Sequence, residues 1–128
     1  MFKLNQIDNN HIQFSMSVYD SKFDSETLID AVHDYINSNN EKYGYFGEST
    51  SLHEVSHQVE NINVDEENGW IYGTLKVLDT PNGKRIQEFL NHNLVQYLQL
   101  NIHGYGHYDS EGEKQKVDNI LSINFINP

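Results

Sequence analysis

The chain contains no cysteine and only two prolines, Pro81 and Pro128, among its 128 residues. Without cysteine, neither a disulfide framework nor thiolate chemistry is available. No apolar run approaches the roughly 20 residues that a membrane-spanning helix needs, and the stretch after Met1 lacks the apolar core of a signal peptide. These absences lead us to expect a soluble protein of the intracellular type.

Basic residues are scarce, because eight Lys and Arg stand against nineteen Asp and Glu, for a formal net charge of −11. An acidic surface repels phosphate backbones and anionic membranes, which argues against nucleic-acid and membrane partners. The same charge suits simple solubility or docking on a basic protein surface. Hydrophobic residues make up 37% of the chain and aromatic residues 12%, enough for one core. We predict one domain over residues 1–128.

Hydrophobic periodicity predicts about six strands and two helices. The alternation of Ile12, Phe14 and Met16 is typical of a half-buried strand, and Asp24 or Ser25 can cap a helix that runs to about Asn37. The Asn68-Gly69 pair predicts a hairpin turn. Further strands are expected at residues 55–64, 70–78, 94–102 and 117–126, a short helix after the turn at 80–83, and an aromatic-rich loop at 41–52. We interpret the fold as α+β, dominated by an antiparallel, barrel-like sheet.

Seven histidines are the main candidates for chemistry. His53 and His57, like His103 and His107, are four residues apart, which in a strand places both rings on one face about 13 Å apart, too far to share a metal. A site with one histidine from each pair stays open, but we assign no metal and no cofactor. Ser56 precedes His57, and adjacent strand residues point to opposite faces, so we predict no Ser–His dyad there.

Four stretches together resemble a known family, the prohead (capsid maturation) serine proteases of tailed phages, which share the herpesvirus-protease fold. The stretches span most of residues 11–128: 28–37 with Gly47-Glu48, 55–59 with 70–84, 101–106, and 121–128. The motif Leu-Asp-Thr-Pro-x-Gly-Lys at 78–84 and the Gly-x-Gly strand at 104–106 are moderately specific, and their order and spacing strengthen the likeness.

The departures from the family pattern lie at the positions of its catalytic residues. The family's nucleophile, the first Ser of Ser-Ser-Arg-Gly, falls on Asn101, and the Arg before the oxyanion-stabilising Gly104 becomes His103. Ser49-Thr50-Ser51 stands where the catalytic His should follow Gly47-Glu48. An Asn amide cannot form an acyl intermediate, and loss of nucleophile or base removes orders of magnitude in rate. The resemblance therefore implies a degenerate member without peptidase activity.

We interpret the chain as a non-catalytic phage structural protein: a capsid decoration, minor head or head-assembly protein. It would be made in the host cytoplasm, reside in the virion and bind capsid or other virion proteins. Tyr43, Tyr45 and Phe46 are either interface anchors or cover for the core. At −11 the domain should repel its own copies unless an apolar patch overrides the charge.

Two other hypotheses remain. In a divergent active protease, Ser51, Ser49 or Ser56 would replace the nucleophile. That enzyme needs a Ser oxygen within hydrogen-bond reach of His53 or His57, and a non-catalytic protein should show no such pair. A metal-dependent enzyme that uses the histidines is the third hypothesis.

Overall fold

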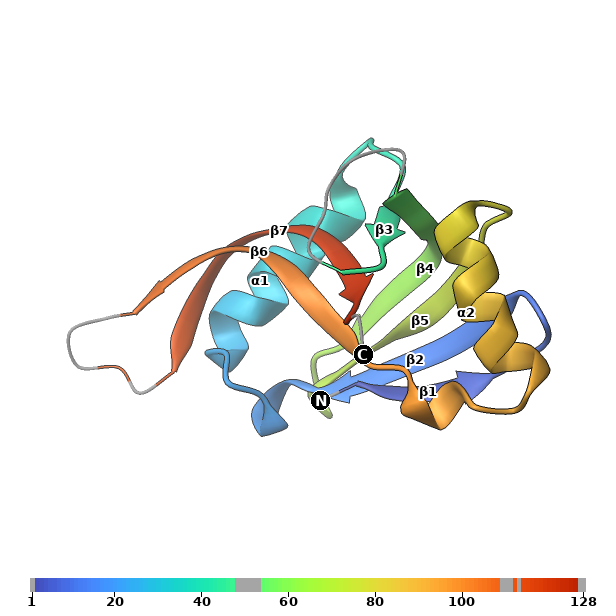
Figure 1. Ribbon diagram of the computed structural model, residues 1–128. Helices are drawn as coiled ribbons and strands as arrows, with labels where there is room; N and C mark the ends of the chain where they lie inside the picture. Colours follow the sequence, from blue (N-terminus) through green and yellow to red (C-terminus); the bar gives the residue numbers. More distant parts are fainter. Residues whose placement is uncertain (1, 48–53, 109–111, 113, 127–128) are drawn as a thin grey trace.

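A computed structural model describes residues 2–47, 54–108, 112 and 114–126 (Figure 1). The described residues form seven strands and two α-helices. In chain order these are β1 (Lys3–Gln6), β2 (His11–Ser17), α1 (Ser25–Asn37), β3 (Tyr43–Tyr45), β4 (Val55–Asp65), β5 (Trp70–Val77), α2 (Pro81–Asn91), β6 (Leu100–Tyr108) and β7 (Gln115–Phe125). Two short 3₁₀ turns, at Val18–Asp20 and Val95–Tyr97, complete the description.

Five strands pair in the antiparallel order β1-β2-β5-β4-β3, and β6 and β7 form a separate antiparallel pair. An isolated bridge between Phe46 and Phe125 joins the two sheets, and the Gly47 N–H donates to the Phe125 carbonyl at 2.7 Å. β7 therefore continues the sheet beyond β3. The described strands do not close a barrel, so the barrel-like expectation holds only in that the sheet is antiparallel.

The core lies between these sheets and the two helices. On β2, Ile12, Phe14 and Met16 point inward, as their alternation predicts. α1 packs against β7 and β4, and α2 against β4 and β5. The buried helical residues recur at a spacing of three or four: Leu28, Ala31, Val32 and Tyr35 on α1, and Ile86 and Leu90 on α2.

Both helices begin at the predicted places because side chains cap their first turns. The Asp24 carboxylate accepts the Thr27 N–H at 3.0 Å, and the Thr80 hydroxyl accepts the Gly83 N–H at 2.9 Å. Pro81 follows Thr80 at the first helical position, where its missing N–H does no harm. The predicted pairing of β4 with β5 is confirmed along their length.

Two predicted elements differ from the structure, and one strand was missed. Residues 43–45, expected in a loop, form β3. The expected strand at 94–102 begins only at Leu100, because Val95–Tyr97 is a 3₁₀ turn whose Tyr97 is 65% exposed. β1 was not predicted, since a four-residue edge strand has too little periodicity to stand out.

Candidate functional site

Ser56 and His57 form a buried hydrogen-bonded pair on β4. The Ser56 Oγ lies 2.7 Å from the His57 Nδ1, and both side chains are 0% exposed. The predictions that the two residues point to opposite faces and form no Ser–His pair are both wrong, so the structure does not meet the expectation that a non-catalytic protein lacks such a contact. Tyr45 pairs with Val55 while Gly44 pairs with His57, so Ser56 is an extra, bulged residue opposite β3. A bulge interrupts strict alternation, which lets both side chains turn inward.

The other nitrogen of the His57 ring contacts β7. Its Nε2 lies 2.7 Å from the Ile123 carbonyl oxygen. A carbonyl only accepts, so Nε2 carries the hydrogen, and Nδ1 accepts the hydrogen of the Ser56 hydroxyl. Burial lowers the pKa of His57 from 6.5 to about 4, against a smaller opposing effect of the bond to Ile123. The ring is therefore neutral at neutral pH.

Close packing encloses this pair. A methyl group at Gly44 on β3 would overlap both the His57 ring and the Ile123 carbonyl. The Phe125 ring meets the His57 ring edge to face, with ring centroids 4.8 Å apart. Ser and His are thus arranged as in a nucleophile–base pair, but with a carbonyl in place of the orienting carboxylate and with neither side chain open to solvent.

The positions that the resemblance assigns to the nucleophile and to the oxyanion-stabilising residues lie elsewhere, along β6. Asn101 is exposed and lines a cavity of about 350 Å³. His103 and Gly104 line a neighbouring cavity of about 180 Å³, and Phe23 and Ile102 contribute to both. The Asn101 amide is therefore open to the surroundings, unlike Ser56 and His57.

The structure does not bring Asn101 and His57 together. Ile102 on β6 faces Ile123 on β7, and His57 bonds to the carbonyl of that same Ile123. Phe125, two residues further along β7, directs its carbonyl to Gly47 on the side of β3. Because carbonyls two residues apart in a strand point to the same edge, β7 lies between His57 and β6.

Gly104 allows a close approach of the two strands, as predicted. A methyl group there would overlap the Asn119 carbonyl, and one at Gly106 would overlap the Lys116 carbonyl. The register partner of His103 is Ser122. The Ser122 hydroxyl is buried and has no hydrogen-bond partner among the described residues, so it makes no pair with that histidine.

Three predicted site residues, Ser49, Ser51 and His53, lie outside the described residues. Among the residues that the structure describes, no three or more His, Cys, Asp or Glu side chains gather as a metal site would require. His107 instead binds Asp118 of β7 at 2.9 Å. Within the described ranges, no helix is long and apolar enough to span a membrane.

The three aromatic candidates around β3 differ in exposure. Tyr45 is 9% exposed and Phe46 is 6% exposed, whereas Tyr43 is half-buried. The Arg85 guanidinium of α2 lies over the Phe46 ring, 4.4 Å from its centroid. Burial favours the core-cover alternative for Tyr45 and Phe46, and Tyr43 remains the candidate anchor.

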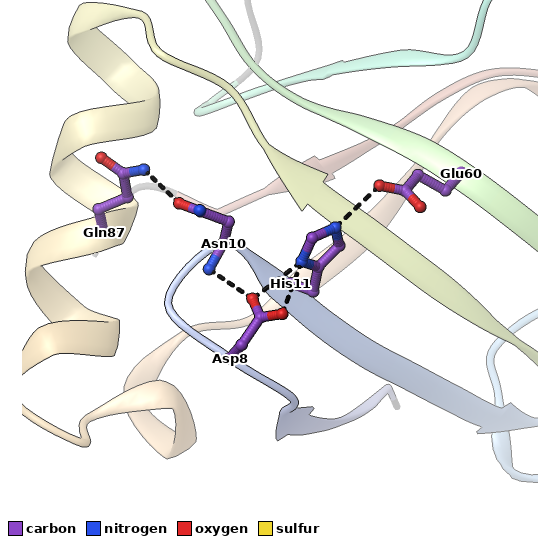
Figure 2. A network of polar contacts seen from close by, with 5 residues as sticks. All are labelled: Asp8, Asn10, His11, Glu60 and Gln87. Carbon is purple, nitrogen blue, oxygen red and sulfur yellow. Dashed lines mark hydrogen bonds and ion pairs between the residues drawn. The ribbon is translucent and has the colours of Figure 1, made fainter.

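A polar network that sequence reasoning missed surrounds His11 (Figure 2). The His11 Nδ1 lies 2.8 Å from Asp8 in the β1–β2 turn, and its Nε2 lies 3.0 Å from Glu60 on β4. The hydrogen bond to Asp8 is the main reason that the pKa of His11 is raised. The two carboxylates contact opposite edges of the ring, so both favour its protonated form, and they do not converge on one point as the ligands of one metal would. The spacing of Asp8 and His11, three residues apart, is the sequence pattern from which this contact could have been predicted.

Comparison with known proteins identifies the fold. No protein-family model matches the chain, and no curated protein sequence matches it significantly. One similar solved structure is the capsid assembly protease gp21 of bacteriophage T4, with a TM-score of 0.62 and 12% sequence identity. The match covers 100% of this chain and 97% of gp21. The chain has the fold of a phage protease.

At 12% identity this likeness concerns the fold, and it confirms the expectation drawn from the prohead proteases in that respect. The described strands β1–β7 and both helices fall within the matched chain. Catalytic residues are not carried over by a likeness of fold, because unrelated functions often share one scaffold.

Proposed function

We propose that this chain is a non-catalytic phage protein that uses a capsid-protease-like fold to associate with capsid or other virion proteins. The proposal rests on where the candidate catalytic side chains lie. Ser56 and His57, which form a Ser–His hydrogen bond among the described residues, are both buried. Asn101, at the nucleophile position that the resemblance assigns on β6, is exposed. A hydrolase needs its nucleophile where a substrate can reach it.

The protonation of His57 supports this proposal. A general base works best when its pKa is near the operating pH. The pKa of His57 is lowered to about 4 by burial, so the ring is a weak proton acceptor at neutral pH. Its Nε2–H is already bound to the Ile123 carbonyl, which ties β4 to β7. We infer that the pair has a structural role.

The fold neighbour supports the capsid association. The T4 protein is a capsid assembly protease, and this is the reason for choosing capsid or other virion proteins as the proposed partners. Decoration, minor head and head-assembly roles all follow from such contact. The formal charge of −11 favours a less acidic or basic partner surface, to which binding weakens as salt screens the attraction.

Purified particles of the phage that encodes this chain provide the test. We expect mass spectrometry to find the intact chain in proheads or mature heads, and to find normally processed capsid proteins when the chain carries Ser56→Ala. Particles that lack the chain at every stage would overturn the association. Unprocessed capsid protein in the Ser56→Ala phage would overturn the non-catalytic role.

A specific observation favours a second candidate, a divergent protease. The Ser56 Oγ and the His57 Nδ1 are within hydrogen-bond distance at 2.7 Å, the contact that an active enzyme requires. Its catalytic use would need both β3 and β7 to move away from the ring, because Gly44 on β3 and Phe125 on β7 pack against it. Labelling of Ser56 by a serine-directed probe would favour this candidate.

A further inference from the structure

The five-stranded sheet has one covered face and one outer face. The buried side chains of both helices join those of β2 and β5 in a single core, so the helices lie on the inner face. On the outer face, register pairing aligns side chains of β2, β5 and β4 in two neighbouring rows: Ser15, Tyr72 and Asn63, then Gln13, Thr74 and Asn61. Register partners share a face of the sheet. All six side chains are exposed or half-buried, so no described helix covers them.

Two aromatic rings stand in the middle of this outer face. Trp70 and Tyr72 belong to β5, the central strand of the five, and are 37% and 43% exposed (Figure 1). Residues two apart in a strand point to the same face about 7 Å from each other. A methyl group at Gly69 would overlap the ring of Tyr19, so this third exposed ring lies against the residue before Trp70. An aromatic strip therefore follows the central strand.

The side chains that surround the aromatic strip are polar and uncharged. They are Asn5 on β1, Gln13, Ser15 and Ser17 on β2, Thr74 on β5, and Asn61 and Asn63 on β4. Within the described part of the chain, the four amide side chains of this set make no hydrogen bond, so their donors and acceptors are available. Formal charges lie at the margins, on Lys3 of the edge strand, on Lys76, and on Asp65, which is bound to Asn68 in the turn.

This composition indicates the chemistry of a ligand. The outer face has no aliphatic side chain in these rows, whereas the centre of a protein interface is typically apolar. Nucleic acids stack on aromatic rings but need cations for their phosphates, and this chain carries −11. A neutral sugar chain fits both features. Its hydroxyl groups match amides and hydroxyls, and its faces of C–H bonds pack on aromatic rings.

We propose that the outer face binds a neutral polysaccharide, with sugar rings stacked on Trp70 and Tyr72 and sugar hydroxyls bonded to the flanking amides. The face extends about 13 Å along β5 from Trp70 to Thr74 and about 14 Å across the strands from β1 to β4. This area exceeds one sugar ring, so several consecutive sugars occupy it. The inference does not rest on the proposed function, because Ser56 and His57 are buried in the interior of the fold.

Fluorescence of the full chain tests the proposal. Trp70 is the single tryptophan of the sequence, so its emission reports directly on the outer face. The probes are uncharged hexasaccharides of glucose, mannose, galactose and N-acetylglucosamine. We expect at least one of them to shift the emission saturably, with the same affinity at about 0.1 M and about 1 M salt, because no ion pair forms. The matching monosaccharide should bind more weakly, since it covers one ring.

Matched variants locate the binding. Tyr72→Ala keeps Trp70 as the reporter and should weaken binding about tenfold, the size expected when one stacking ring is lost. Asn63→Ala should weaken it about threefold through a lost hydrogen bond. The control is Tyr105→Ala on β6, where Tyr105 is 65% exposed, and this variant should bind like the native chain. Circular dichroism verifies that each variant is folded.

Four outcomes would overturn the proposal. The first is an emission that none of the four hexasaccharides changes, and the second is a Tyr72→Ala variant that binds as tightly as Tyr105→Ala. The third is sugar binding that disappears at high salt. The fourth is a response confined to oligothymidylate or to polylysine, which would assign the outer face to a nucleic acid or to a basic protein.

Discussion

The His57 ring on β4 donates its Nε2–H to the Ile123 carbonyl on β7, across 2.7 Å and 66 positions of sequence. Through this bond and the Ser56 hydroxyl, the ring satisfies both of its nitrogens without water. It joins the five-stranded sheet to the β6–β7 pair beside the Phe46–Phe125 bridge. The candidate catalytic pair thus lies at the junction of the two sheets.

Gly44→Ala should destabilise the fold. The added methyl would overlap the His57 ring and the backbone carbonyl of Ile123, neither of which can move freely in the core. We expect a loss of about 1–3 kcal/mol in the free energy of unfolding, typical of overpacking. Urea denaturation measures it, with the exposed Asn63→Ala on β4 as a control that should change stability by less than about 0.5 kcal/mol. Equal stability of the two variants would mean that His57 is not enclosed.

His57 should make the protein less stable in mild acid. Its pKa in the folded chain, about 4, is below the ordinary value of 6.5, so the unfolded chain binds the proton more readily. The full stability of the buried neutral ring is present above pH 6.5 and is lost progressively as the pH falls from 6.5 to about 4. Below that pH, His57 causes no further loss of stability, because the ring is protonated in both the folded and the unfolded chain. At about 1.4 kcal/mol for each pKa unit, the loss is about 3 kcal/mol.

The control for this pH dependence is His57→Gln, which keeps a donor and an acceptor but does not titrate. Chemical denaturation between pH 7 and pH 4 should show a shallower loss of stability in the variant. An identical pH dependence in both proteins would contradict the burial of a neutral His57.

The stability that His11 contributes should depend on pH in the opposite direction. Asp8 and Glu60 raise its pKa in the folded chain, and its register partner on β5 is the positively charged Lys76. Stability from His11 is present below the unfolded value of 6.5 and is lost as the pH rises through the raised folded pKa. Glu60→Gln should reduce this loss above pH 6.5, measured as melting temperature against pH.

Glu67→Gln provides the matched charge change, because Glu67 is an exposed carboxylate in the β4–β5 turn. It should leave the pH profile unchanged in that range. If both variants alter the profile alike, net charge rather than the His11–Glu60 contact is responsible.

Phe46→Ala should unfold the protein more readily than Tyr43→Ala. Phe46 is 6% exposed and lies beneath Arg85, so its removal leaves a cavity, and large-to-small changes of this kind cost about 3–5 kcal/mol. Tyr43 is half-buried and its hydroxyl bonds to Glu41 near the surface. Thermal denaturation compares them. A stable Phe46→Ala variant that no longer binds particles would instead identify Phe46 as an interface anchor.

Local patterns predicted most of the fold. The alternation on β2, the Asp24 cap and the Asn68-Gly69 turn each depend on neighbouring residues, and each gave the right element. β3 was missed because a three-residue strand has almost no period, and the strand at 94–102 was placed too early because apolar Leu94 and Val95 imitate a buried run.

The candidate site was less predictable, because it depends on one irregular pairing. The bulge at Ser56 turns two neighbouring side chains inward, and nothing in the local sequence marks it. The partner of His57 is a main-chain carbonyl 66 residues away, which no side-chain motif can indicate. The sequence did predict that the glycines of β6 allow the neighbouring strand to approach closely, and a methyl group at either one would overlap a carbonyl of β7.

Intact-mass analysis after treatment with a fluorophosphonate probe tests the central claim most directly, because this probe forms a covalent bond with an activated serine. We predict no adduct on the native chain, with Ser56 enclosed and Asn101 in the open position on β6. Ser56→Ala should behave identically, and the denatured chain should be equally unlabelled. A stoichiometric adduct on the native chain that a single Ser→Ala substitution abolishes would contradict the account and establish an active serine protease centre.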